Sequence, residues 1–168
     1  MMQGRSYHIL FLSRRNSARS IMAQAILNKI GQGRFQAFSA AVDPAEAIEP
    51  IVQGLLRAAD LPIDDARPKH FSDFAAAGAP ELDFVFTLSD TAAGEPLPEW
   101  PGLPVTAHWR CADPVLAEGE LWEKRQAFVD VMSQLERRLA IFINLPFESL
   151  DRMSLQTQVR AIADPPSP

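Results

Sequence analysis

The chain has 168 residues, the length of one domain, with 47% hydrophobic and 22% charged residues, which excludes a disordered chain and a collagen-like one. No apolar run approaches the roughly 18 residues that a membrane span requires, and the first residues lack the apolar stretch of a secretory signal. We therefore expect one cytoplasmic domain over residues 1–168, frayed from about residue 163, that has no contact with a membrane.

The net charge of −5 conceals a basic amino-terminal segment. Residues 1–42 contain six Lys or Arg and no Asp or Glu, so the remaining residues together carry −11. Because binding to a nucleic-acid backbone requires a broad basic face, this distribution argues against a nucleic-acid partner. It favours a site for a small anion near the amino terminus.

Apolar patterns predict strands that alternate with helices along the chain. Such alternation implies parallel pairing through right-handed crossovers, hence an α/β fold with an open parallel four-stranded sheet and helices on both faces. Ligands in such sheets bind beyond the carboxyl ends of the strands. The expected strands are 7–12, 35–40, 82–88 and 105–109, and the expected helices are 20–30, 48–59, 71–77, 121–145 and 150–162.

Two later segments have patterns of their own. Four prolines between residues 95 and 104 predict a surface loop, because proline cannot donate to a strand ladder. The helix expected over 121–145 has apolar residues at steps of three, four and seven, which predicts one buried stripe. The stripe consists of Leu121, Phe128, Val131, Leu135, Leu139 and Phe142.

The turn between the first strand and the first helix has residues suited to holding an oxyanion. A turn at this place aims successive backbone N–H groups and the positive helix end at one point. Arg19 adds a planar contact to two oxygens, and Asn16 tolerates the left-handed backbone that curls such a loop. The predicted oxyanion site consists of Ser13, Arg14, Arg15, Asn16, Ser17, Ala18, Arg19 and Ser20.

These residues resemble the phosphate loop of the low-molecular-weight protein tyrosine phosphatases and, more closely, that of the thioredoxin-coupled arsenate reductases. The string N-S-A-R-S at 16–20 matches, as do F-S-A at 38–40, V-T-A-H-W at 105–109 and D-P at 113–114. The resemblance covers nearly the whole chain and implies the family's three-layer, Rossmann-like fold. In the family mechanism a cysteine thiolate attacks the oxyanion, an arginine bears the developing charge and an aspartate protonates the leaving group, which assigns Arg19 and Asp113 to the last two roles.

The chain departs from the family pattern at the residues that carry its chemistry. Ser13 stands at the position of the nucleophilic cysteine, and the reductases' further cysteines, expected at Ser89 and near Leu97, are absent. The single cysteine, Cys111, matches none of these positions, so the chain alone forms no disulfide and carries no two-thiol cycle. Bulkier residues also replace a threonine and two glycines of the pattern, at Arg14, Arg15 and Ala41.

A serine nucleophile needs a neighbouring general base, which the loop itself does not supply. The candidates are His8, His70, His108 and Asp113, and none is persuasive as a partner of Ser13. We therefore predict a degenerate family member that binds phosphate, arsenate or sulfate without turnover, with Ser13 at the nucleophile position and Arg19 and Asp113 as the other catalytic positions.

Two alternatives remain open. One is an active phosphatase or arsenate reductase that uses Ser13 with a base, or thiols from another protein. The other is a regulatory module that receives a phosphate or carboxylate from a partner such as a phosphoprotein, with Arg14 and Arg15 as contacts. No metal is expected, because His, Asp and Glu lack ligand spacing, and no nucleotide cofactor is expected, because neither glycine fingerprint occurs.

Overall fold

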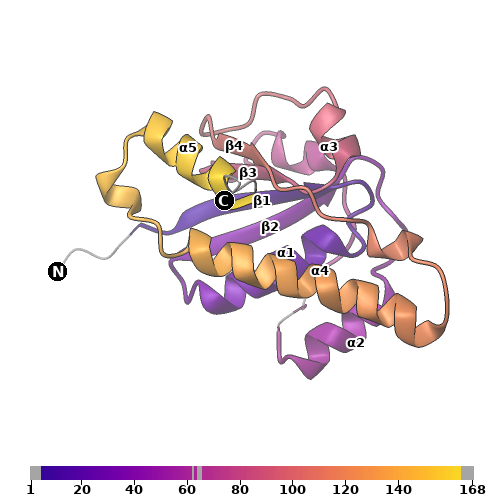
Figure 1. The fold of residues 1–168 in the computed structure, drawn as a ribbon. Coiled ribbons are helices and arrows are strands. Elements are labelled where there is room, and N and C mark those ends of the chain that lie inside the picture. Colours follow the sequence, from indigo (N-terminus) through magenta and orange to yellow (C-terminus); the bar gives the residue numbers. More distant parts are fainter. Residues whose placement is uncertain (1–4, 62, 64–65, 164–168) are drawn as a thin grey trace.

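The computed structural model describes residues 5–61, 63 and 66–163 (Figure 1). Four parallel strands form one sheet in the order β2-β1-β3-β4, which confirms the predicted α/β fold. We expected the chain to fray from about residue 163. Residues 164–168 lie outside the described residues, so the structure does not bear on this expectation. The strands are β1 (Tyr7–Ser13), β2 (Phe35–Ala41), β3 (Phe84–Thr87) and β4 (Val105–His108).

The register of the sheet brings the strand ends together at one edge. Ser13 pairs with Ala41 on one side, while its neighbour Leu12 pairs with Thr87 on the other. Thr87 in turn pairs with His108 of β4. The segments that follow β1, β2 and β3 therefore leave the sheet at the same end, where ligands bind in parallel sheets.

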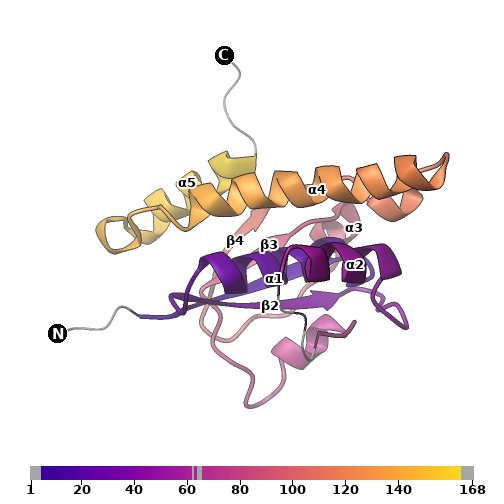
Figure 2. The same ribbon diagram turned by 90° about the horizontal axis from the view of Figure 1, so that it is seen from below.

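The two faces of the sheet are covered unequally (Figure 2). One face packs against four helices, α1 (Arg19–Ile30), α2 (Pro50–Ala58), α4 (Leu121–Phe142) and α5 (Arg152–Ala163). The other packs against the short α3 (Asp90–Gly94), the 3₁₀-helix η1 (Phe71–Phe74) and the proline-rich segment 95–104. In the described part of the chain, no helix has the length and apolar character needed to cross a membrane.

Several expected elements differ from those observed. The helix predicted over 71–77 is the shorter η1, and α3 was not expected. The last long helix ends at Phe142, and its predicted stripe is buried from Phe128 onward but not at Leu121, which is 73% exposed. The prediction for Leu121 is wrong because the first two turns of α4, residues 121–126, are exposed throughout. Two further 3₁₀-helices, η2 (Pro114–Leu116) and η3 (Phe147–Ser149), flank α4.

Phe142 lies at the centre of an aromatic cluster beneath the sheet. Its ring is fully buried and lies 5.1 Å from Phe84, 5.3 Å from Phe86 and 5.5 Å from Phe35, between ring centroids. We expect Phe142→Ala to lower the free energy of unfolding by about 3 kcal/mol, because the substitution leaves a cavity that this rigid cluster cannot fill. Urea unfolding measures the loss. Ile141→Ala, at a neighbouring residue that is 53% exposed, should change stability little, and equal losses in both variants would contradict the assignment.

Candidate functional site

The segment between β1 and α1 surrounds a pocket of about 310 Å³ at the carboxyl end of the sheet. We call residues 13–19 the anion loop. Most of the loop lines the pocket, together with residues from the segments that follow β2 and β4. The lining residues are Ser13, Arg14, Arg15, Ser17, Ala18, Arg19, Ala45, Glu49, Asp113, Val115 and Leu116.

The carbonyl groups of the loop are tied to the neighbouring segment 43–49. The carbonyls of Arg14, Arg15 and Ser17 accept backbone hydrogen bonds of 2.9–3.0 Å from Asp43, Ala45 and Glu49, respectively. By contrast, no acceptor among the described residues contacts the backbone N–H groups of four residues of the loop. These residues are Arg14, Arg15, Ser17 and Ala18. Ser17 and Ala18 are buried, and because buried N–H groups normally have a partner, their N–H groups are suited to an anion in the pocket.

The side chain of Asn16 stabilises the curled shape of the loop. Its φ of 52° lies in the left-handed region, and its side chain is fully buried. The amide Nδ2 donates to Ser20 Oγ at 2.7 Å, while Oδ1 accepts from the backbone N–H of Lys69 at 3.1 Å. Asn16 and Ser20, two residues predicted to bind the oxyanion, are therefore not part of the pocket lining and support the loop instead.

Lys69 connects this support to β2. Its Nζ donates to the Ser39 carbonyl at 3.0 Å, and burial lowers its pKa from 10.5 to about 8, with Arg67 acting in the same direction and Asp73 opposing. Between these two pH values the unfolded chain retains a proton that the folded chain has released. The free energy of unfolding should therefore rise with pH in this window, by about 1 kcal/mol because the partly exposed amine is screened by solvent.

Urea unfolding at several pH values from 7.5 to 10 tests this expectation. Lys69→Met should abolish the rise, whereas Lys124→Met, at an exposed position of α4, should retain it. An identical pH dependence in wild type and Lys69→Met would contradict the assignment.

Arg19 is the first residue of α1 and is only 7% exposed. Its Nη1 donates to the Cys111 carbonyl at 3.1 Å, and its Nη2 lies 3.4 Å from Asp113 Oδ2. Burial lowers the pKa of Arg19, and the carboxylate of Asp113 opposes this effect. Because an arginine stays protonated even so, a fixed positive charge faces the pocket.

Asp113 also fixes the segment after β4. Its Oδ1 accepts from the backbone N–H of Val115 at 3.0 Å, which begins η2 and brings Val115 and Leu116 to the pocket. The sequence predicted Asp113 but not its two apolar followers or Glu49. The sequence did contain a signal for Val115 and Leu116, since an Asp-Pro pair commonly starts a turn that places the next residues beside it.

The two arginines that depart from the family pattern leave the pocket open. Arg15 Nη1 pairs with Asp43 Oδ2 at 2.6 Å, and Arg14 is exposed at the rim. Arg15 is not among the residues with positive φ, so its side chain imposes no left-handed strain where the family has glycine.

Ser13 is 2% exposed and contacts no basic side chain in the described part of the chain. Among the described residues its Oγ contacts Ser20 Oγ at 2.8 Å and accepts from the Asn16 backbone N–H at 3.2 Å. The three histidines considered as bases are absent from the pocket lining. His8 contacts the Glu81 carbonyl, His70 begins η1 and His108 contacts Thr87 and Asp90.

The other positions considered for thiol chemistry, Ser89, Leu97 and Cys111, make contacts that support the fold. Ser89 Oγ accepts from the backbone N–H of Ala92 at 3.1 Å and so begins α3. Leu97 packs against the hydrophobic residues on the sheet face that α3 and η1 cover. Cys111 is buried, which raises its thiol pKa, while the charges of Arg138 and Arg19 oppose this effect. The thiol therefore stays protonated, and the residue contributes its carbonyl to Arg19.

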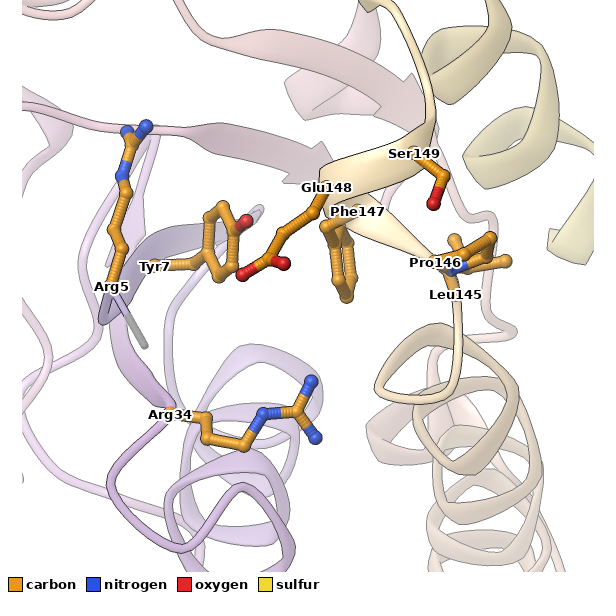
Figure 3. Close-up of a pocket in the computed structure, with 8 residues that line it drawn as sticks. All are labelled: Arg5, Tyr7, Arg34, Leu145, Pro146, Phe147, Glu148 and Ser149. Carbon is orange, nitrogen blue, oxygen red and sulfur yellow. The ribbon is translucent and has the colours of Figure 1, made fainter. Parts of the chain in front are cut away.

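A second pocket, of about 340 Å³, lies at the opposite end of the sheet, where β1 begins (Figure 3). Arg34 and Glu148 point into it, and Phe147 lies beside Glu148. Arg5, also in its lining, pairs with Asp83. These long charged side chains are exposed, so this pocket lacks a buried cation such as Arg19.

Comparisons with known proteins agree with the fold. Residues 8–156 match the family model of low molecular weight phosphotyrosine protein phosphatase. The fold is similar to an arsenate reductase in its phosphate-binding state, with a TM-score of 0.63, 20% identity and coverage of 82% of this chain and 96% of that one. It is also similar to the Erwinia amylovora tyrosine phosphatase amsI, with a TM-score of 0.63, 18% identity and coverage of 86% and 96%.

An arsenate reductase of Archaeoglobus fulgidus has a TM-score of 0.59 at 22% identity, with coverage of 79% of this chain and 98% of that one. At these identities the solved structures bear on the fold alone. No curated protein matches the chain in sequence. Since the family model spans most of the chain, the protein belongs to the low molecular weight phosphotyrosine protein phosphatase family.

Proposed function

We propose that this protein binds a tetrahedral oxyanion, such as phosphate, arsenate or sulfate, in the anion loop and does not convert it. One observation carries the proposal: the pocket is lined by the buried guanidinium of Arg19 and by four residues whose backbone N–H groups have no acceptor among the described residues. Charge-assisted hydrogen bonds from such fixed donors are stronger than neutral ones. They suit a ligand with several equivalent oxygens.

The surroundings of Ser13 support the proposal that the protein does not convert the bound oxyanion. A cysteine thiol ionises near pH 8.5 and is readily activated by a positive loop, whereas an unassisted serine hydroxyl stays protonated at neutral pH. The neighbours of Ser13 Oγ are a hydroxyl and an N–H group, and neither takes up a proton at neutral pH. Asp113 lines the pocket and would be the general acid, but an acid without a nucleophile performs no phosphoryl transfer.

Two measurements test the proposal together. Isothermal titration calorimetry with phosphate, arsenate and sulfate should detect one site per chain, and the wild type should not hydrolyse p-nitrophenyl phosphate above the uncatalysed rate. Absence of binding would remove the oxyanion site. Hydrolysis that disappears in Ser13→Ala would establish an active enzyme in place of the inactive one proposed here.

A further inference from the structure

A third pocket, of about 710 Å³, lies on the sheet face that packs against α3, η1 and the proline-rich segment. It has more than twice the volume of the pocket at the anion loop. Two in-register pairs of the strands β3 and β4 line it, Val85 with Thr106 and Thr87 with His108. Its size falls within the range of roughly 300–1,000 Å³ that is typical of sites for small organic ligands. We call it the edge cavity, because β4 is an edge strand of the sheet.

The proline-rich segment gives the edge cavity an apolar wall. Leu97, Pro98 and Trp100 of this segment line the cavity. The indole of Trp100 is only 7% exposed, and its ring centroid lies 6.2 Å from that of Phe71 in η1, in an edge-on arrangement. The ring is therefore held in place by the fold. A fixed aromatic and aliphatic wall of this kind favours a ligand with a planar apolar group.

Hydrogen bonds fix two polar groups of the cavity lining. Nδ1 of His108 lies 2.8 Å from Thr87 Oγ1 and 3.0 Å from the Thr87 carbonyl oxygen. Nε2 of the same ring lies 3.0 Å from Asp90 Oδ1. Because both ring nitrogens are engaged, the imidazole and the Thr87 hydroxyl keep one orientation. Polar groups that are already in position lower the entropic cost of binding a ligand.

Arg160 of α5 brings a positive charge to the same cavity. Its Nε donates to the Thr106 carbonyl at 3.2 Å, and since a guanidinium has five N–H donors, others remain for a ligand. The described residues that line the cavity include no Asp or Glu, although the chain as a whole has a net charge of −5. The carboxylate of Asp90, which contacts His108, also pairs with Arg110 Nε at 3.0 Å. The charge of the cavity therefore favours an anionic group.

We propose that the edge cavity is a second ligand site, which binds a small aromatic carboxylate with its ring against Trp100 and Leu97 and its carboxylate on Arg160. An inorganic oxyanion would leave the apolar wall in water, and a neutral hydrocarbon would leave the cation without a partner. An aromatic acid satisfies both. The cavity shares no lining residue with the pocket at the anion loop, so this inference is independent of the proposed function.

Cinnamate and its neutral counterpart cinnamamide provide the test, because the two molecules share a ring and differ in charge. Isothermal titration calorimetry should show that the wild type binds cinnamate about tenfold more tightly than cinnamamide, since a hydrogen bond to a charged group contributes more than a neutral one. Arg160→Met should remove this preference and leave the affinity for cinnamamide unchanged. Arg160→Lys, which keeps the charge but not the planar set of donors, should bind cinnamate with intermediate affinity.

Arg137→Met is the matched control, because Arg137 is an exposed arginine of α4 outside the cavity lining. This variant should retain the preference for cinnamate, and thermal melts identify any variant that fails to fold. The proposal is overturned if the wild type binds neither molecule or binds both equally. It is also overturned if both folded Arg160 variants bind cinnamate as tightly as the wild type.

Competition with inorganic phosphate distinguishes the edge cavity from the anion loop. The affinity for cinnamate should be the same with and without saturating phosphate at constant ionic strength. Displacement of cinnamate by phosphate would overturn the proposal, because the carboxylate would then occupy the anion loop and not the edge cavity.

Discussion

Arg19→Ala is expected to reduce the affinity for phosphate about a thousandfold, equivalent to about 4 kcal/mol. The substitution removes a buried cation and, with it, the charge-assisted hydrogen bonds that the proposed anion would accept. It also leaves the carboxylate of Asp113, which lies 3.4 Å from Arg19 Nη2, beside the incoming anion without a counter-charge. Isothermal titration calorimetry with phosphate measures the change.

Two comparisons separate loss of binding from loss of structure. Arg19→Lys keeps the charge but not the planar pair of donors, so it should retain an intermediate affinity. Arg57→Ala, at an exposed position near the end of α2, should bind phosphate as the wild type does. Thermal melts identify any variant that fails to fold. Equal affinity in Arg19→Ala and wild type would exclude the anion loop as the binding site.

The sheet was predictable because its strands are short apolar runs between turn residues. The sequence indicated a strand over 7–12, and β1 extends from Tyr7 to Ser13. The sequence predicted which face of α4 is apolar but not how far along the helix that face is buried. Periodicity identifies which face of a helix is apolar, but it does not show where the sheet beneath the helix ends, so Leu121 was assigned to the core although it extends into solvent.

The proline-rich segment illustrates a second limit. Its prolines correctly indicated irregular backbone, and this usually lies on the surface. Leu97 and Trp100 of this segment nevertheless pack against the sheet face that lacks long helices, and Trp100 is only 7% exposed. Such burial depends on which face the long helices leave uncovered, and local patterns contain no information about it.

The sequence likewise predicted one part of the candidate site and not another. The order of residues around Arg19 was enough to indicate an anion loop, because a strand, a turn and a helix in succession aim backbone N–H groups at one point. The contacts that position Arg19 were not accessible from the sequence. Its guanidinium is held by the Cys111 carbonyl, 92 residues away, and a backbone carbonyl leaves no trace in the residue type that carries it.

Ser13→Cys is expected to create phosphatase activity about ten-thousandfold above the background of the wild type. The position already has the surroundings that favour a thiolate, since the Asn16 N–H donates to atom Oγ and Ser20 Oγ lies 2.8 Å away. The positive loop and Arg19 lower the pKa of a thiol placed there. A thiol at this position is therefore ionised near neutral pH, whereas the serine hydroxyl is not. Hydrolysis of p-nitrophenyl phosphate measures the gain.

The double variant Ser13→Cys with Asp113→Asn separates the new nucleophile from its acid. p-Nitrophenolate leaves without a proton, whereas the alkoxide formed from an alkyl phosphate such as β-glycerophosphate needs one. The double variant should therefore retain most of the activity on the first substrate and lose most of it on the second. If Ser13→Cys folds and binds phosphate but hydrolyses neither substrate, the geometry of the loop, and not the missing sulfur, prevents catalysis. Arg15, which stands where the family has glycine and is tied to Asp43, would then be the first residue to restore.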